Sequence, residues 1–283
     1  MRIIDDIVSF SDWVLEIIQS SEHPFVKSAQ EMINFFFDLE EKLPKEYGWR
    51  KYSTDSFGEL LKQCKTTDEG NSVYWKDISR TIETYSVTLC FRSNEVLRSA
   101  IRSLNNKEIV PAAILTRSLL ELASTMLENS NILWQTIKQI PKDKTNTIIA
   151  SEDVAKLLSR MIWGTRLGND IPEHLKQKNI LTTLQSLSKN ENAKELLEKY
   201  EFLCEIAHPN YLGNVRFWGD DVISNDDGSF TVKIKKKGDS TLKPEIVENI
   251  IWGIGWSAEC VRNSFLILRH TTKILNDRFV IIC

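Results

Sequence analysis

Apolar residues recur at intervals of three and four along most of the chain, which is the spacing of one face of an α-helix. The last predicted helix begins at LKPEIVENI, and its apolar stripe runs from Ile246 to Leu275. Residues 72–104 contain neither glycine nor proline, so nothing within that segment enforces a break. The periodicity predicts further helices over residues 3–19, 24–43, 56–65, 72–104, 111–141, 151–163, 172–188 and 192–208.

Residues 213–240 depart from this helical pattern. Asp227-Gly228 is flanked by β-forming residues, and the segment SFTVKIK alternates polar and apolar positions. A turn dipeptide beside a period of two predicts a β-hairpin. The expected fold is therefore mainly α, a multi-helix bundle with an inserted β-hairpin near residues 213–240. Residues 1–68 are expected to form an N-terminal helical segment and residues 69–283 the main bundle domain, unless the two form one continuous domain.

Composition narrows the class of protein. The 283 residues are 42% hydrophobic and carry a formal net charge of −3, which argues against coating nucleic acid through bulk charge but permits a local basic groove. The five cysteines are scattered and form no CxxC pair, so neither a zinc ribbon nor a disulfide framework is expected. The start of the chain lacks the apolar core of a signal peptide, and no uninterrupted apolar run approaches the ~20 residues of a membrane span. We expect a soluble, cytoplasmic protein.

The first candidate site is Arg117 and Glu121, which lie four residues apart in AAILTRSLLELAS. That helix is apolar nearly all round, so it is expected to be buried, and a buried charge must find a partner. Two interpretations are open. The pair is either a structural ion pair or a polar centre in which the arginine binds a phosphate or carboxylate.

The second candidate site is YEFLCEIAHPN, where Glu205 and His208 share a helix face just before Pro209. A histidine at a helix C-terminus interacts well with the helix dipole, so the pattern is also that of an ordinary helix end. Alternatively, His208 acts as a general base, with Asn210 and Arg216 in the following turn-rich segment as ligand contacts. Glu-x-x-His also occurs in di-iron bundles, but its required second copy is missing, so no metal or cofactor is expected.

A third set lies on the polar side of the last helix. Arg262, Asn263 and His270 form either a solvated face or an alternative catalytic site. Seven residues separate Arg262 from His270, an offset of about 80° around a helix.

The stretches ILTRSLLELAS and YEFLCEIAHPN together resemble a pattern of uncharacterised bacterial all-helical proteins. There, an R-x-x-x-E helix precedes a Y-x-x-L-x-E-x-x-H-P element. The build resembles the HEPN (higher eukaryote and prokaryote nucleotide-binding) superfamily, over roughly residues 85–208. This resemblance implies a toxin–antitoxin or phage-defence setting, RNA or a protein as partner, and a homodimer. HEPN ribonucleases carry arginine, a polar residue and, after four to six intervening residues, histidine. The nearest match here, Arg262-Asn263 to His270, is one residue too long.

Two functions follow, of which the first is favoured. In a non-catalytic binding module, Arg117, Glu121, Glu205 and His208 form an internal network, and the hairpin with its KIKKK run contacts a partner. In a metal-independent ribonuclease, the same four residues, or Arg262 with His270, cleave RNA. A metal–carboxylate enzyme, the remaining alternative, would need two further acids near Glu205 and His208.

Overall fold

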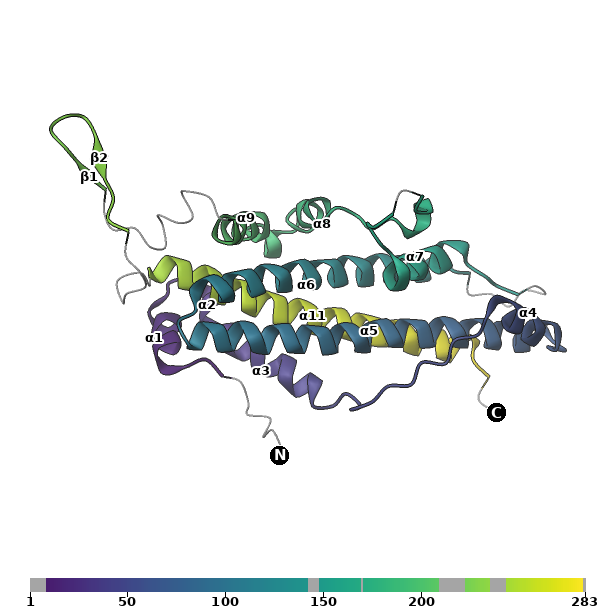
Figure 1. The fold of residues 1–283 in the computed structure, drawn as a ribbon. Coiled ribbons are helices and arrows are strands. Elements are labelled where there is room, and N and C mark those ends of the chain that lie inside the picture. The colour runs from purple at the N-terminus through teal and green to yellow at the C-terminus, as the bar shows by residue number, and fades with distance from the viewer. Residues whose placement is uncertain (1–8, 142–147, 169, 209–221, 235–242, 282–283) are drawn as a thin grey trace. The chain divides into compact units, whose positions relative to one another are not determined.

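In the computed structural model the described residues are 9–141, 148–168, 170–208, 222–234 and 243–281. Across these ranges the chain is 72% helical, with ten α-helices and one two-stranded antiparallel hairpin (Figure 1). The expected fold class is therefore confirmed. The helices are α1 Asp12–Ser20, α2 Pro24–Lys27, α3 Ala29–Glu40, α4 Thr54–Lys62, α5 Thr67–Asn105, α6 Ile109–Lys138, α7 Glu152–Trp163, α8 Ile180–Leu187, α9 Leu196–Ala207 and α11 Pro244–Phe279.

Three predicted helices are divided in the structure. The segment predicted over residues 24–43 forms α2 and α3, with Ser28 between them as the C-cap of α2. The segments predicted over residues 172–188 and 192–208 begin with short 3₁₀ turns, η1 (Glu173–Leu175) and η2 (Glu191–Ala193), which precede α8 and α9. Apolar spacing alone does not register such breaks, because a 3₁₀ turn keeps nearly the same side-chain period.

The chain divides into two compact units, each assembled from three segments. Unit 1 comprises residues 1–37, 93–124 and 184–259, and unit 2 comprises residues 38–92, 125–183 and 260–283. Helices α5, α6 and α11 contribute residues to both units. The predicted division near residue 68 stays a prediction.

The core of unit 1 surrounds the first half of α11. From Ile246 to Ala258, nearly every residue of this helix is buried. Gly253 permits the close approach of its neighbours, because a Cβ there would lie 2.5 Å from the Thr116 methyl of α6 and 3.6 Å from Leu203 of α9. The apolar stripe predicted for the last helix therefore identifies core positions.

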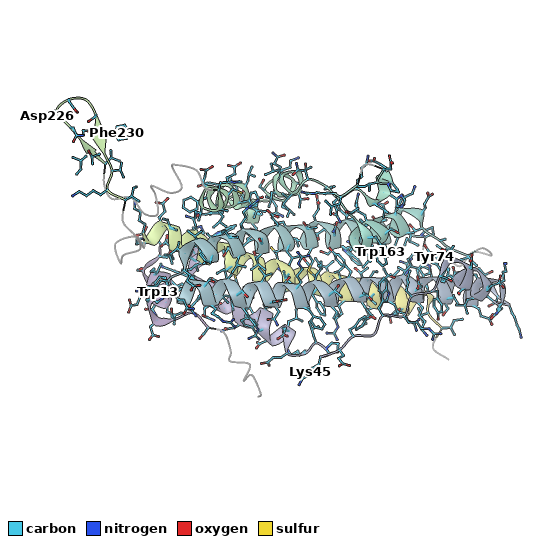
Figure 2. The ribbon with its side chains drawn as sticks, viewed as in Figure 1. Trp13, Lys45, Tyr74, Trp163, Asp226 and Phe230 are labelled. Carbon is cyan, nitrogen blue, oxygen red and sulfur yellow. The ribbon has the colours of Figure 1, made fainter. Side chains whose placement is uncertain are left out.

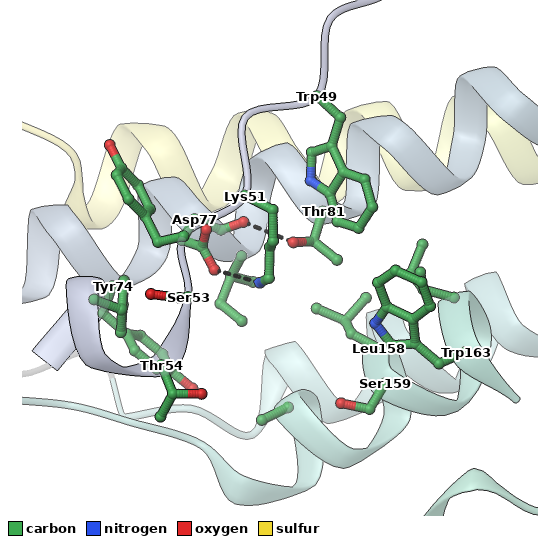
Figure 3. A pocket seen from close by; sticks show the side chains of 15 residues that line it. Trp49, Lys51, Ser53, Thr54, Tyr74, Asp77, Thr81, Leu158, Ser159 and Trp163 are labelled. Carbon is green, nitrogen blue, oxygen red and sulfur yellow. Dashed lines mark hydrogen bonds and ion pairs between the residues drawn. The ribbon is translucent and has the colours of Figure 1, made fainter.

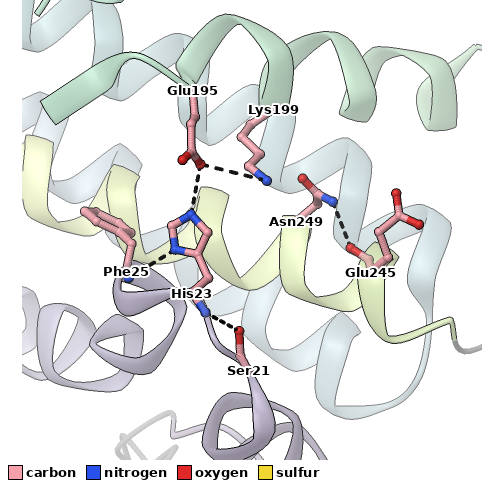
Figure 4. A network of polar contacts seen from close by, with 7 residues as sticks. All are labelled: Ser21, His23, Phe25, Glu195, Lys199, Glu245 and Asn249. Atoms are coloured by element: carbon pink, nitrogen blue, oxygen red, sulfur yellow. Dashed lines mark hydrogen bonds and ion pairs between the residues drawn. The ribbon is translucent and has the colours of Figure 1, made fainter. Parts of the chain in front are cut away.

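A polar network connects α2 to the start of α9 in unit 1 (Figure 4). His23 is the N-cap of α2, and its Nδ1 accepts the Phe25 backbone N–H at 3.1 Å. Its Nε2 lies 2.9 Å from the Glu195 carboxylate. Because Nδ1 accepts, the proton belongs on Nε2, so the neutral tautomer satisfies both contacts.

Unit 2 is organised around aromatic residues near the end of α11. Trp75 of α5 is fully buried and stacks on Phe279, with ring centroids 4.9 Å apart. Arg278 donates to the carbonyls of Ile140 and Pro141 at 3.1 and 3.0 Å, so the last turn of α11 binds the segment that follows α6. Figure 2 marks Tyr74 on α5 and Trp163 at the end of α7, which belong to the same unit.

The predicted hairpin is present within the described residues 222–234. Strand β1 (Ile223–Ser224) pairs with β2 (Phe230–Thr231), in the register Ile223 with Thr231 and Ser224 with Phe230. The predicted Asp-Gly turn lies at its tip, where Gly228 has φ of 82°, a conformation that favours glycine. Residues 213–221 and 235–240 of the predicted range, which include most of the KIKKK run, lie outside the described residues.

Within the described ranges, one helix is long and apolar enough to cross a membrane by length and composition alone. This helix is α6, and 44% of its most apolar stretch is buried inside the protein. Its buried residues include Leu119, Leu120 and Met126.

Candidate functional site

The predicted pair on α6 is formed, and it includes a tyrosine from α9. Arg117 and Glu121 make an ion pair of 3.2 Å. Tyr200, which is 3% exposed, donates its hydroxyl to Glu121 at 2.8 Å and accepts from Arg117 at 3.3 Å. The Arg117 guanidinium also lies 5.6 Å from the centroid of the Tyr200 ring. The three side chains form one connected cluster within unit 1, in which Arg117 and Glu121 remain about one third exposed.

The electrostatic environment of this cluster keeps Tyr200 protonated and Arg117 charged. Burial raises the pKa of Tyr200, and the neighbouring Glu121 carboxylate raises it further, against the opposing hydrogen bond from Arg117. The hydrogen bond to Tyr200 raises the pKa of Arg117. Tyr200 is therefore a neutral hydrogen-bond bridge between a permanent cation and a carboxylate, an arrangement that stabilises packing of α9 on α6.

The other half of this predicted site is placed elsewhere on α9. Glu205 is exposed, and five residues correspond to about 140° around a helix, so it does not share the face of Tyr200. His208 is exposed and caps α9 with an extended backbone, as expected before Pro209. The structure thus joins Arg117 and Glu121 through Tyr200. Asn210 and Arg216 lie outside the described residues.

The alternative set on α11 has its own contacts in unit 2. Arg262 donates to Asn263 at 3.5 Å, and both residues are half-buried. The exposed His270 packs its ring against Trp134 of α6, with centroids 5.1 Å apart. His270 therefore has an aromatic neighbour.

A cavity of roughly 490 Å³ in unit 2, the basic pocket, was not predicted from the sequence. Four cationic side chains and one carboxylate line it, so its formal charge is +3 although the whole chain carries −3. Arg92 comes from α5 and Arg160 from α7, and neither side chain has an acidic partner among the described residues. The lining side chains that matter here are Arg92, Arg160, Arg166, Lys178, Glu128 and Asn129.

Both oxygens of the acid in the basic pocket accept hydrogen bonds. Glu128 is buried, and its two oxygens accept from Lys178 at 3.0 Å and from Thr183 at 2.8 Å. Next to it on α6, Asn129 donates to the buried Tyr85 hydroxyl at 3.0 Å. Glu128 therefore neutralises Lys178 and leaves the arginines uncompensated.

The ends of α7 and the segment that follows it position Arg160 and Arg166. Ser151 caps the start of α7 by accepting from the Val154 N–H, and Gly164 ends the helix. Thr165 pairs with the segment at Leu175 and Gln177 through backbone hydrogen bonds of 3.0 and 3.3 Å. The Arg166 guanidinium donates to the Lys178 carbonyl. A side chain at 164 would collide with the Arg160 carbonyl, so glycine is required at this tight turn.

Convergent guanidiniums in a polar cavity bind oxyanions, because a planar fork of N–H donors matches phosphate and carboxylate oxygens. The sequence contained only a weak signal for this site. Arg160 and Arg166 are six residues apart, whereas Arg92 is far away in the chain, and nothing local indicates that they meet.

Across the described residues, no group of three or more histidine, cysteine, aspartate or glutamate side chains is arranged to hold a metal ion. Comparison with known proteins finds no matching family model, no similar curated protein and no similar solved structure. The chemistry of these sites therefore has to be argued from their own geometry.

Proposed function

We propose that this protein is a non-catalytic binding module that holds RNA through its phosphate groups at the basic pocket. The observation that carries the proposal is the convergence of Arg92, Arg160 and Arg166 on one cavity whose single acid is already paired with Lys178. Like charges gathered without counter-ions repel one another, and an anionic ligand removes that cost.

The contacts of the predicted catalytic residues support binding rather than cleavage. A metal-independent ribonuclease needs a histidine base beside a cation that stabilises the phosphate. Instead, Arg117 is engaged by Tyr200 and Glu121, His270 packs against Trp134, and Arg262 donates to Asn263. The resemblance to HEPN proteins would place such a module in a bacterial defence or toxin–antitoxin system, and this setting is part of the proposal.

The test is salt-dependent RNA binding by the purified full chain in EDTA. Fluorescence anisotropy of a labelled RNA would be recorded between 50 and 200 mM salt for wild type and for Arg92→Gln/Arg160→Gln. Each lost phosphate contact reduces the salt slope by about 0.7, so the double variant should bind more weakly with a slope smaller by about 1.4.

A matched control removes the same charge elsewhere. Arg102→Gln/Arg269→Gln neutralises two exposed arginines outside the basic pocket. Its RNA affinity and salt slope should remain near those of wild type. Equal losses in the two double variants would reject the basic pocket as the RNA site. Cleavage of the labelled RNA in EDTA, lost in His208→Ala or His270→Ala, would instead establish the ribonuclease.

A further inference from the structure

Unit 2 contains a second cavity, the aromatic pocket, of roughly 270 Å³ (Figure 3). The segment before α4 supplies Trp49 and Lys51, α5 supplies Tyr74 and Asp77, and α7 supplies Trp163. The Trp49 and Trp163 ring centroids are 5.8 Å apart with an interplanar angle of 31°. Trp163 is 58% exposed, which is a large apolar surface for a residue next to a cavity.

The polar groups of the aromatic pocket are incompletely satisfied. Asp77 is 9% exposed, and its Oδ2 accepts from Lys51 Nζ at 2.8 Å. Its Oδ1 is buried without a hydrogen-bond partner among the described groups, and so is the indole N–H of Trp49. Buried polar atoms are nearly always paired, so an unpaired acceptor on Asp77 and an unpaired donor on Trp49, two residues that line one cavity, point to a ligand that supplies both counterparts.

These features define the chemistry of the ligand. A flat ring is required for stacking on an indole, and it must offer an N–H to Asp77 and an acceptor to Trp49. A cation would have to compete with Lys51, which already holds the Asp77 carboxylate, so a neutral ring is favoured. The cavity lies just below the usual size range for ligand pockets, which suits a single ring system.

We propose that the aromatic pocket binds a nucleobase that carries a ring N–H beside a carbonyl, namely guanine or uracil. The base stacks on Trp163, its N–H donates to Asp77 Oδ1, and its carbonyl accepts from the Trp49 indole. Adenine and cytosine present a ring-nitrogen lone pair where guanine and uracil present the N–H, and that lone pair faces the Asp77 carboxylate unfavourably.

The inference identifies a base-recognition site, and it does not require the basic pocket to bind phosphate. Nucleosides, which carry no phosphate, separate the two. Quenching of tryptophan fluorescence and calorimetry would be measured with guanosine, adenosine, uridine and cytidine on the full chain. Guanosine should bind at least about tenfold more tightly than adenosine, and uridine more tightly than cytidine.

Two variants test the proposed contacts of the bound base with Trp163 and Asp77. Trp163→Ala removes an exposed side chain, so it should fold normally, and it should weaken guanosine binding by about tenfold or more. Asp77→Asn replaces an acceptor by a group that also donates, so the preference for guanosine over adenosine should disappear or reverse. Trp134→Ala, which changes a half-buried tryptophan outside the aromatic pocket, is the matched control and should bind as wild type does.

The outcomes distinguish this inference from the proposed function. Guanosine binding that survives Arg92→Gln/Arg160→Gln would support the aromatic pocket whether or not RNA binds at the basic pocket. Equal affinity for guanosine and adenosine, no binding of any nucleoside, or guanosine binding unchanged in Trp163→Ala would each overturn it. In those cases RNA binding at the basic pocket could still hold.

Discussion

Tyr200 of α9 donates its hydroxyl to the Glu121 carboxylate of α6 across 2.8 Å, and the same hydroxyl accepts from Arg117. Tyr200 is the first residue of the Y-x-x-L-x-E-x-x-H-P element, to which the sequence assigned no role, and it completes the ion pair predicted on α6. The cluster connects two helices far apart in the chain, although the buried Arg117 Nε has no hydrogen-bond partner among the described groups. These contacts favour a role in packing for Arg117 and Glu121.

Tyr200→Phe tests that role. Removing the hydroxyl leaves the ion pair in place but deletes two hydrogen bonds to charged groups, so the free energy of unfolding should fall by about 1–2 kcal/mol. Chemical denaturation measures the change. Tyr52→Phe, at a tyrosine whose hydroxyl makes no hydrogen bond within the described residues, should change stability by less than about 0.5 kcal/mol. Equal stability of wild type and Tyr200→Phe would show that the cluster does not support packing.

Glu128→Gln should lower the stability of the protein and raise its affinity for RNA. The glutamine keeps a contact with Thr183 but releases Lys178 and raises the charge of the basic pocket by one unit. The protein should lose about 1–3 kcal/mol of stability, because a buried charge-assisted bond is lost. At the same time RNA affinity at low salt should increase, and the salt slope should steepen by about 0.7 if Lys178 meets a phosphate.

The control for Glu128→Gln is Glu83→Gln, which removes the same charge from a glutamate bonded to Tyr47 rather than lining the basic pocket. Its RNA affinity should stay close to that of wild type. If both glutamine variants bind RNA equally tightly, the gain reflects net charge alone, and the basic pocket has no special part in it.

Alkaline conditions should destabilise the fold partly through Cys90. Burial, with a smaller contribution from the Glu40 charge, raises the pKa of the Cys90 thiol to about 12. An unfolded thiol ionises near pH ~8.5, so above that pH the unfolded state binds fewer protons than the folded state. The stabilisation is complete below pH ~8.5 and is lost as pH rises toward 12, at up to about 1.4 kcal/mol per pH unit.

Urea midpoints measured between pH 7.5 and 10.5 would show this effect. Cys90→Ala should have lower stability at neutral pH, because the substitution leaves a gap, but a shallower decline above pH 9. The two proteins are compared by the slope of stability against pH, because this slope does not depend on the size of the gap that the substitution leaves. Parallel declines in wild type and Cys90→Ala would show that another group is responsible.

Gly253→Ala should destabilise unit 1. The new methyl group would lie 2.5 Å from the methyl of Thr116, a fully buried residue, so the packing around it would have to shift. Overpacking of this kind costs about 1–3 kcal/mol and should outweigh the gain in helix propensity of about 1 kcal/mol. Gly58→Ala, in α4 with nothing within 4 Å, should instead be neutral or stabilising by up to about 1 kcal/mol. Thermal unfolding of the two variants makes the comparison, and a stabilised Gly253→Ala would contradict it.

The sequence by itself determined the local structure of this protein. Helical periodicity located α5, α6, α7 and α11 to within a few residues, and the Asp-Gly turn located the hairpin, because both signals depend on neighbours in the chain. The Arg117–Glu121 contact was predictable for the same reason, since residues four apart on a helix are adjacent. The sequence did not allow a prediction of whether that pair belongs to a functional site or to helix packing.

Only the tertiary structure decided which distant residues meet. Tyr200 joins Arg117 although 83 residues separate them, and Lys178 meets Glu128 across 50 residues. Arg92 and Arg160 line the same cavity from different helices, and Lys51 and Asp77 line another with Trp163. Helix periodicity specifies which face of each helix is buried but not which helix covers it. Packing between segments far apart in the chain determines which helices meet, and both pockets are formed where such segments meet.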